Sequence, residues 1–194
     1  MKLHVIAIAY QKPVELRMLC DSFIRQTYDH WELIIVHDGP PPAAILDVIS
    51  LYDDPRINLL NSDERLGNWG NAHRRSYLAG LQGDIDDYVL LTNDDNVYVP
   101  RFVEFMLKEG NMDTGIIYCN TVHSHLTYSG QVSELEVGKI DGGALIVSLP
   151  LAQEAGYVHD AGHADGLYAV DCKKLCVKKS LKIVHINKFL FIHN

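Results

Sequence analysis

The sequence predicts an α/β protein with a central, mainly parallel mixed sheet flanked by helices. Two observations lead to this prediction. In the first half, short apolar runs rich in β-branched residues alternate with stretches of helical periodicity. The chain has 194 residues, 47% hydrophobic and 22% charged, which is typical of a globular domain. We therefore expect one domain over residues 1–194, with a first half of about 1–98 and a second half of about 99–194.

The first half predicts four strands separated by three helices. The strands are expected at 3–9, 31–36, 57–60 and 88–92, and the helices at 13–24, 43–51 and 72–81. In the first helix, Leu16, Leu19 and Phe23 lie on one apolar stripe that can pack on a sheet. Because ligands of such sheets bind beyond the carboxyl ends of the strands, the segments 10–12, 37–40 and 92–96 are expected to line one crevice.

The second half is less regular. It predicts helices at 100–109 and 164–176, strands at 115–119 and 142–147, and a late strand or strand pair at 183–192. The polar segment 123–137 is expected to form a hairpin or a mobile loop. No internal repeat or linker divides the chain.

Charge narrows the class of protein. Asp plus Glu number 25 against 17 Lys plus Arg, so the net charge is −8, which argues against nucleic acid as a partner. Residues 172–194 hold six Lys and no acid. They form either a solvated lysine face or an anion-facing surface. The apolar run 5–9 is too short for a signal peptide or a membrane span. We expect no transmembrane segment and a cytoplasmic location, with peripheral membrane association left open.

The strongest local motif is the run 92–96, Thr-Asn-Asp-Asp-Asn, directly after an apolar strand. The adjacent carboxylates of Asp94 and Asp95 repel each other unless a cation or hydrogen bonds compensate. A divalent metal with oxygen ligands, shared with substrate phosphates, is one such compensator. The alternative is a turn whose Asp and Asn side chains cap the next helix.

The opening of the chain resembles the inverting glycosyltransferases of family 2, which have the GT-A fold. The matching residues are Tyr10, Ser22, Gln26-Thr27-Tyr28, Glu32 and Asp38-Gly39, followed by the segment DDYVLLTNDDNVYVP at 86–100. The likeness is good through about residue 110. Four positions depart from the family pattern. They are Gln11, His37, the pair Arg74-Arg75 and Ala164-Asp165, where the family usually has Glu-Asp.

The resemblance implies a nucleotide-sugar donor, with a UDP-sugar as the expected one. Asp38 would accept a hydrogen bond from the imide N–H of a uracil-type base. Tyr10 and the backbone of Ala9 would line the base pocket. Arg65 or Arg74 would add positive charge near the phosphates or the sugar. The alternative for each arginine is a helix-surface or capping role.

The resemblance also implies a cation site and a general base. Asp94 would bind ribose or a metal-bound water, and Asp95 would ligate Mn²⁺ or Mg²⁺. Near the end of the fold, His193 would complete the metal site; His185 is a weaker alternative. Asp165 would take the proton of the attacking hydroxyl.

The base assignment depends on position rather than on basicity. A free Asp has a pKa of about 3.9, so it is a weak base whose benefit comes from its placement. Asp160 and Asp141 are the rivals of Asp165 for this role.

The predicted function is a metal-dependent inverting glycosyltransferase of polysaccharide biosynthesis. It would move a sugar to a hydroxyl of a glycan or other acceptor. The alternative is a non-catalytic GT-A module that binds the donor and acts with a partner. A sugar-nucleotide pyrophosphorylase or a Rossmann dehydrogenase is disfavoured, because no glycine-rich loop follows the first strand at 10–13. The sequence carries no prediction of oligomeric state.

Overall fold

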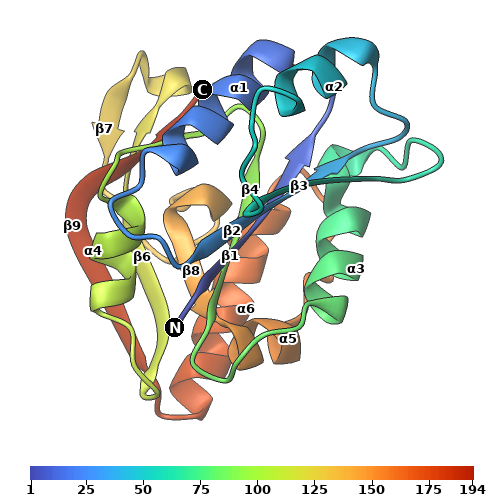
Figure 1. Ribbon diagram of the computed structural model, residues 1–194. Helices are drawn as coiled ribbons and strands as arrows, with labels where there is room; N and C mark the ends of the chain where they lie inside the picture. The colour runs from blue at the N-terminus through green and yellow to red at the C-terminus, as the bar shows by residue number, and fades with distance from the viewer.

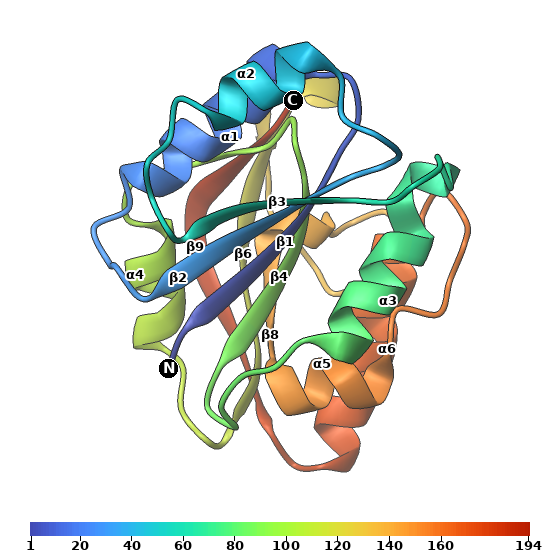
Figure 2. The same cartoon turned by 45° about the vertical axis from the view of Figure 1, so that its right-hand side comes forward.

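A computed structural model describes all residues, 1–194, as one mixed sheet with helices on both faces. Figure 2 shows α1, α2 and α4 on one face and α3, α5 and α6 on the other. The helices are α1 (Pro13–Ile24), α2 (Ala43–Ile49), α3 (Asn71–Gly80), α4 (Phe102–Lys108), α5 (Leu149–Ala155) and α6 (Ala164–Lys178). The strands are β1 (Leu3–Ala9), β2 (Trp31–His37), β3 (Ile57–Asn61), β4 (Tyr88–Asn93), β5 (Val97–Tyr98), β6 (Thr114–His123), β7 (Ser129–Gln131), β8 (Leu145–Ser148) and β9 (Lys182–His193).

The strand order is β3-β2-β1-β4-β8-β6-β9-β5, with β7 paired to β6 (Figure 1). The strands β3, β2, β1 and β4 are parallel, and so are β6 and β9. Between these two blocks β8 runs antiparallel to both neighbours. The predicted mainly parallel mixed sheet is confirmed.

The pairing of the central strand β1 shows which chain segments lie together at one end of the sheet. All seven of its side chains are buried, as expected for a parallel strand covered on both faces. Its pairing sets Ala9 opposite His37 of β2 and Ile8 opposite Asn93 of β4. The chain segments that follow these three strands therefore leave the sheet at one edge.

Two elements were not predicted from the sequence. The helix α5 has a proline in its first turn, which is a start signal, but it has only seven residues. The strand β5 has two residues and pairs antiparallel with the distant β9, so no local pattern marks it.

For three segments of the second half, the structure differs from the sequence prediction or decides between alternatives that it left open. The predicted strand at 142–147 begins later, because Gly142–Ala144 forms a 3₁₀ turn, η3, before β8. The segment 183–192 is one strand, β9, rather than a pair. Part of the polar segment 123–137 does form a hairpin, since β7 pairs antiparallel with the end of β6.

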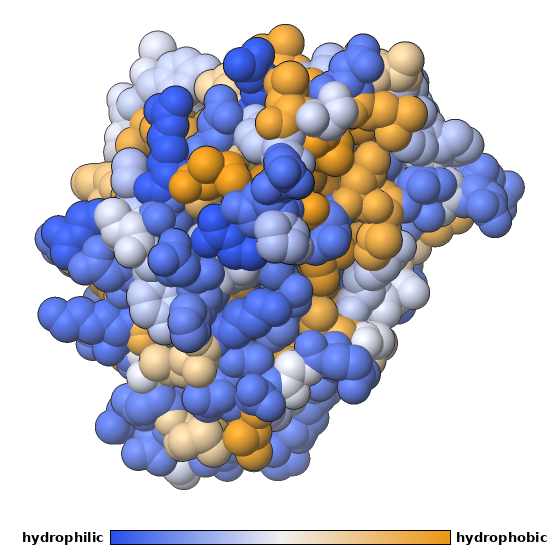
Figure 3. Space-filling view, in the orientation of Figure 1, coloured by the Kyte–Doolittle hydropathy of each residue, from blue (hydrophilic) through white to orange (hydrophobic).

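The face of the molecule seen in Figure 3 has separate hydrophilic and hydrophobic areas. Figure 3 shows that the left and lower parts of this face, where Figure 1 places β9 and the end of α6, are mainly hydrophilic. Hydrophobic side chains gather in a band right of centre. None of the helices has the length and apolar character needed to cross a bilayer.

Candidate functional site

A cavity of about 390 Å³ lies at the carboxyl ends of β1, β2 and β4; we call it the β1–β4 cavity. Its lining includes Tyr10, Lys12, Asp38, Asp94 and Asp95. These residues come from the three segments that follow the parallel strands. The predicted crevice is therefore confirmed.

The Asp94 carboxylate joins the ends of β1 and β4. Its Oδ2 accepts a hydrogen bond from the backbone N–H of Tyr10 at 2.9 Å, and the residue is only 5% exposed. Burial raises the pKa of Asp94 to about 7, and the neighbouring charge of Asp95 acts in the same direction, although the Tyr10 N–H opposes both. The nearby positive charge of Lys12 also lowers this pKa, but it does not offset the effect of burial.

Asp95 has one oxygen paired and one without a partner. Its Oδ2 lies 2.6 Å from the Lys12 ammonium, whereas its Oδ1 is buried and accepts no hydrogen bond. The Lys12 side chain is 48% exposed, so this ion pair is weak and can be exchanged for another cation. A buried orphan carboxylate oxygen beside a second carboxylate fits a divalent ion with oxygen ligands.

The Asp38 carboxylate holds the loop that crosses the β1–β4 cavity. It accepts hydrogen bonds from the backbone N–H groups of Leu66 (2.7 Å) and Gly67 (3.0 Å) and lies 2.9 Å from Nε2 of His73. Burial raises its pKa, but these bonds outweigh that effect, so the pKa of Asp38 is lowered. A carboxylate offers about four acceptor positions. One remains on Oδ2 for the predicted bond to a nucleobase, and Nε of Arg65 lies 3.7 Å from this oxygen.

Tyr10 and Arg65 contact each other in the lining of the β1–β4 cavity. The Arg65 guanidinium lies 4.0 Å from the centre of the Tyr10 ring, a cation–π contact. The carbonyl of Ala9 accepts a hydrogen bond from the backbone N–H of Asp38 at 3.0 Å. Ala9 is fully buried and does not line the cavity, so its backbone shapes the pocket from behind.

Arg74 is buried and lies at the base of a second cavity. Its guanidinium donates to the carbonyls of Trp69 (2.6 Å) and Thr92 (3.0 Å) and to the side-chain oxygen of Asn93. Desolvation lowers the pKa of this guanidinium, although the nearby acids oppose the shift. The side chain therefore ties the loop before α3 to the end of β4.

The second cavity has a volume of about 300 Å³ and lies beside the N-terminus of α6; we call it the α6 cavity. Its lining includes Asp141, Tyr157, Asp165 and His193. Trp69 and Asn93 line both cavities, which therefore adjoin.

Asp165 lies in the first turn of α6 and faces the α6 cavity. Its Oδ2 accepts from the backbone N–H of Gly142 at 3.2 Å and its Oδ1 from Gly166 at 2.8 Å. The rival Asp160 forms an exposed ion pair with Arg75 at 2.8 Å and is outside the lining. Position therefore favours Asp165 over Asp160.

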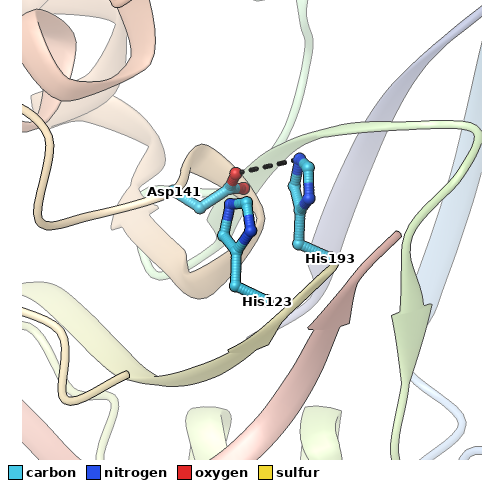
Figure 4. Close-up of side chains that lie close together, drawn as sticks. All are labelled: His123, Asp141 and His193. Carbon is cyan, nitrogen blue, oxygen red and sulfur yellow. Dashed lines mark ion pairs between the residues drawn. The ribbon is translucent and has the colours of Figure 1, made fainter. Parts of the chain in front are cut away.

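The third rival, Asp141, lines the α6 cavity beside two histidines. Figure 4 shows Asp141 with His123 and His193, and Asp141 Oδ2 lies 3.5 Å from His193 Nε2. Burial raises the pKa of Asp141 to about 6; the charge of Asp165 adds to this and His193 opposes it. The ligand atoms of these three residues lie within 4.8 Å of one another.

His193 and Asp95, the two predicted metal ligands, line different cavities. His193 faces the α6 cavity, where its Nδ1 is buried without a partner, whereas Asp95 lines the β1–β4 cavity. The weaker candidate His185 stacks on Tyr118 and lies 2.8 Å from the side-chain oxygen of Asn120, outside both cavities.

Sequence reasoning assigned no role to His123 and did not single out Trp69. His123 is the register partner of His193 in the parallel pair of β6 and β9, and their rings stack with centres 4.1 Å apart. A signal was present, since each of these strands ends in an aliphatic residue followed by His. Trp69 carried no pattern that distinguished it from a surface residue.

The lysines of residues 172–194 do not line either cavity. The helix α6 begins at the α6 cavity and runs about 22 Å away from it, at 1.5 Å per residue. These lysines therefore supply no positive charge to the lining of either cavity, and the solvated face and the anion-facing surface both stay predictions.

The sheet order, the acid pair after β4 and the two adjoining cavities define a GT-A type α/β protein, and comparison with known proteins agrees. The model of the family "Glycosyl transferase family 2" matches residues 4–132. This chain therefore belongs to glycosyl transferase family 2. The uncharacterized glycosyltransferase YwdF of Bacillus subtilis (strain 168) is 29% identical over 109 residues, which cover 56% of this chain and 38% of YwdF.

Solved structures show the same fold. The crystal structure of S. aureus TarS 1-349 in complex with UDP-GlcNAc has a TM-score of 0.75 at 13% identity and matches 99% of this chain and 58% of that one. The mannosyltransferase PcManGT from Pyrobaculum calidifontis, in complex with GDP-Man and Mn²⁺, has a TM-score of 0.73 at 17% identity, over 98% and 56% of the two chains. This chain thus spans 38% of YwdF, 58% of the TarS chain and 56% of PcManGT.

Proposed function

We propose that this chain transfers a sugar from a nucleoside-diphosphate sugar to a hydroxyl group of a carbohydrate or other acceptor, with inversion at the anomeric carbon. The observation that carries the proposal is the pair of adjoining cavities. One contains the acid pair Asp94 and Asp95, and the other contains the carboxylate of Asp165, which has no ion-pair partner. Such a transfer needs a diphosphate site and a base on opposite sides of the reacting carbon.

The β1–β4 cavity is proposed to hold the nucleotide. Every residue that lines it lies between Ile8 and Asp95, which supports a donor-binding half at about 1–98 and an acceptor half at about 99–194. Tyr10 and Arg65 would face the base, and the free acceptor position of Asp38 would take an N–H from it. UDP fits this description, and it is the nucleotide part of the sugar donor named for TarS.

The acid pair is proposed to hold Mn²⁺ or Mg²⁺; the similar fold of PcManGT was solved in complex with GDP-Man and Mn²⁺. Asp95 would supply the orphan Oδ1 as a ligand, and Asp94 would contact the ribose or a metal-bound water. His193 remains the candidate for a further ligand. A bound divalent cation would stabilise the negative charge that develops on the departing nucleoside diphosphate.

Asp165 is proposed as the general base. The acceptor hydroxyl would give its proton to a carboxylate oxygen of Asp165 while its own oxygen forms a bond to the anomeric carbon. The bond from that carbon to the diphosphate breaks, and the electron pair leaves with the nucleotide. The N–H groups of Gly142 and Gly166 hold the carboxylate in place, so position rather than basicity serves the step.

The test is a thermal-shift screen of UDP-, GDP- and dTDP-sugars, each with and without Mn²⁺. A ligand that binds only the folded state raises the melting temperature. We expect selective stabilisation by one donor, larger with Mn²⁺, and release of the matching nucleoside diphosphate when an acceptor panel is added. If no nucleotide sugar changes the melting temperature at millimolar concentration, the proposal is wrong.

A second candidate is a donor-binding module without transfer activity. The observation that favours it is Ala164, a buried methyl group where the family usually has an acid, which leaves one acidic side chain at the start of α6. Donor binding in calorimetry without hydrolysis or transfer across the acceptor panel would favour this candidate.

A further inference from the structure

We propose that Trp69 is the platform on which the pyranose ring of the acceptor sugar stacks; the proposal rests on the proposed function. Its indole ring is 70% exposed and lines both the β1–β4 cavity and the α6 cavity. An exposed indole face at the border of the two cavities offers an apolar surface to the C–H face of a sugar ring. Neighbouring polar groups can form hydrogen bonds with the hydroxyls of the sugar.

The backbone at Trp69 is strained. Four consecutive residues, 67–70, have positive φ angles of 67°, 47°, 53° and 73°. Glycine occupies the first and last of these positions, but Asn68 and Trp69 do not have its freedom. A bulky aromatic residue in this region is a true outlier, and such outliers cluster at binding sites.

The strained loop is held from both sides, so the ring is presented on a rigid base. The Asp38 carboxylate accepts the N–H groups of Leu66 and Gly67 before the turn. After it, the buried Arg74 donates to the carbonyl of Trp69 at 2.6 Å. A ligand that stacks on a pre-organised ring loses less conformational entropy on binding than one that must order it.

The position of the ring favours the acceptor over the nucleotide. A side chain on Gly162, which lines the α6 cavity, would begin 3.5 Å from the edge of the Trp69 six-membered ring. Tyr10 and Arg65, which are proposed to face the base, line only the β1–β4 cavity, whereas Trp69 lines both. The ring thus borders the cavity that contains Asp165, where the attacking hydroxyl must lie.

The polar groups around the ring suit a sugar. Asn93, Tyr157 and Asp141 line the α6 cavity and offer donors and acceptors at its walls. The combination of one apolar face and several polar groups at the rim matches a pyranose, which has an apolar C–H face and polar edges.

Tryptophan fluorescence can report the contact directly. The only other tryptophan, Trp31, is 1% exposed, so accessible quenchers act on Trp69. With UDP and Mn²⁺ present, we would titrate methyl β-D-glucopyranoside, methyl β-D-galactopyranoside and methyl N-acetyl-β-D-glucosaminide. We expect at least one to shift the emission to shorter wavelength and to protect it from acrylamide, and Trp69→Phe to remove this response.

Calorimetry and kinetics separate stacking from a merely structural role. Trp69→Ala is expected to weaken binding of the responding pyranoside, and to raise the KM for the acceptor, by about tenfold. Trp69→Tyr should restore most of the affinity because it restores an aromatic face. The matched control is Val158→Ala, which removes an exposed apolar side chain that lines neither cavity and should leave both values unchanged.

The outcomes distinguish this inference from the proposed function. If the wild type binds and turns over a nucleotide sugar but no pyranoside moves the emission, or if Trp69→Ala binds as well as the wild type, Trp69 is not the platform. If pyranosides act on Trp69 while no nucleotide sugar binds, the proposed donor is wrong and the sugar platform stands.

Discussion

The two cavities share Trp69 and Asn93 but are built in different ways. The β1–β4 cavity is formed by segments that follow neighbouring parallel strands, all within the first 95 residues. The α6 cavity collects its residues from β4, η3, β9 and the N-terminus of α6, out to His193. The order of the parallel strands is enough to form the β1–β4 cavity. The α6 cavity forms only when segments that are distant in the sequence pack together.

The largest expected effect separates the chemistry of the two cavities. Asp165→Asn keeps the shape of the side chain but removes the proton acceptor, so we expect transfer to fall by roughly 10²- to 10⁴-fold while donor binding is kept. Turnover and donor calorimetry measure the two properties. The matched control is Asp160→Asn, an exposed residue paired with Arg75, which should change neither. A loss of donor affinity in Asp165→Asn would contradict its assignment as base.

The second largest expected effect concerns the β1–β4 cavity. Asp95→Ala removes the proposed metal ligand, and we expect the Mn²⁺-dependent part of donor affinity and rate to fall at least about 100-fold. Glu15→Ala serves as the control, because Glu15 is an acid near the pair that lines no cavity. Full activity of Asp95→Ala at saturating Mn²⁺ would show that the cation is held elsewhere.

A third change affects both cavities through the loop they share. A methyl group on Gly70 would come 2.3 Å from Ile8, and the residue has a φ of +73°. We therefore expect Gly70→Ala to lower the free energy of unfolding by about 2–4 kcal/mol. Gly80→Ala, where nothing lies within 4 Å, is the control in urea denaturation. Equal stability of the two variants would mean that the loop adapts.

The smallest expected effect is a pH dependence of stability due to Asp94. Its pKa is about 7 in the folded protein against an ordinary 3.8, so the folded state favours the protonated carboxyl. That contribution is complete below pH 3.8 and is lost as the pH rises through about 7. Relative to Asp94→Asn, the wild type should lose roughly 1–3 kcal/mol between pH 4 and 8 without metal.

Mn²⁺ provides the check on this assignment. A bound cation favours the ionised carboxylate, so it should reduce the difference between the wild type and Asp94→Asn at pH 8. Parallel unfolding curves of the two proteins at every pH would contradict the raised pKa.

The fold was predictable because its main elements carry local signals. The seven buried residues of β1, the stripe of α1 and the acid pair after β4 can each be recognised within a few positions. The predicted family is confirmed, and so is the crevice at the ends of β1, β2 and β4. The roles of single residues within it, including Asp38, Asp95 and Asp165, stay predictions.

What could not be predicted depends on contacts between distant segments. His123 meets His193 only through the pairing of β6 with β9, and Asp141 joins them from the η3 turn. Asp38 was expected to contact the base, but its carboxylate also binds the N–H groups of the loop at 66–67 and the His73 ring. The two-residue strand β5 likewise depends on β9. Apart from the aliphatic residue and His that end both β6 and β9, these contacts leave no pattern in the local sequence.

The pairing of β6 with β9 also affects the order in which parts of the sheet form during folding. Thr114 and Lys182, the first partners in this pair, are 68 positions apart, and long-range pairings form slowly because a large loop must close. A ribosome releases the residues around the β1–β4 cavity well before β9. A nascent chain can therefore form the parallel strands β1 to β4 first. The part of the α6 cavity that His193 lines forms only after β9 has paired with β6.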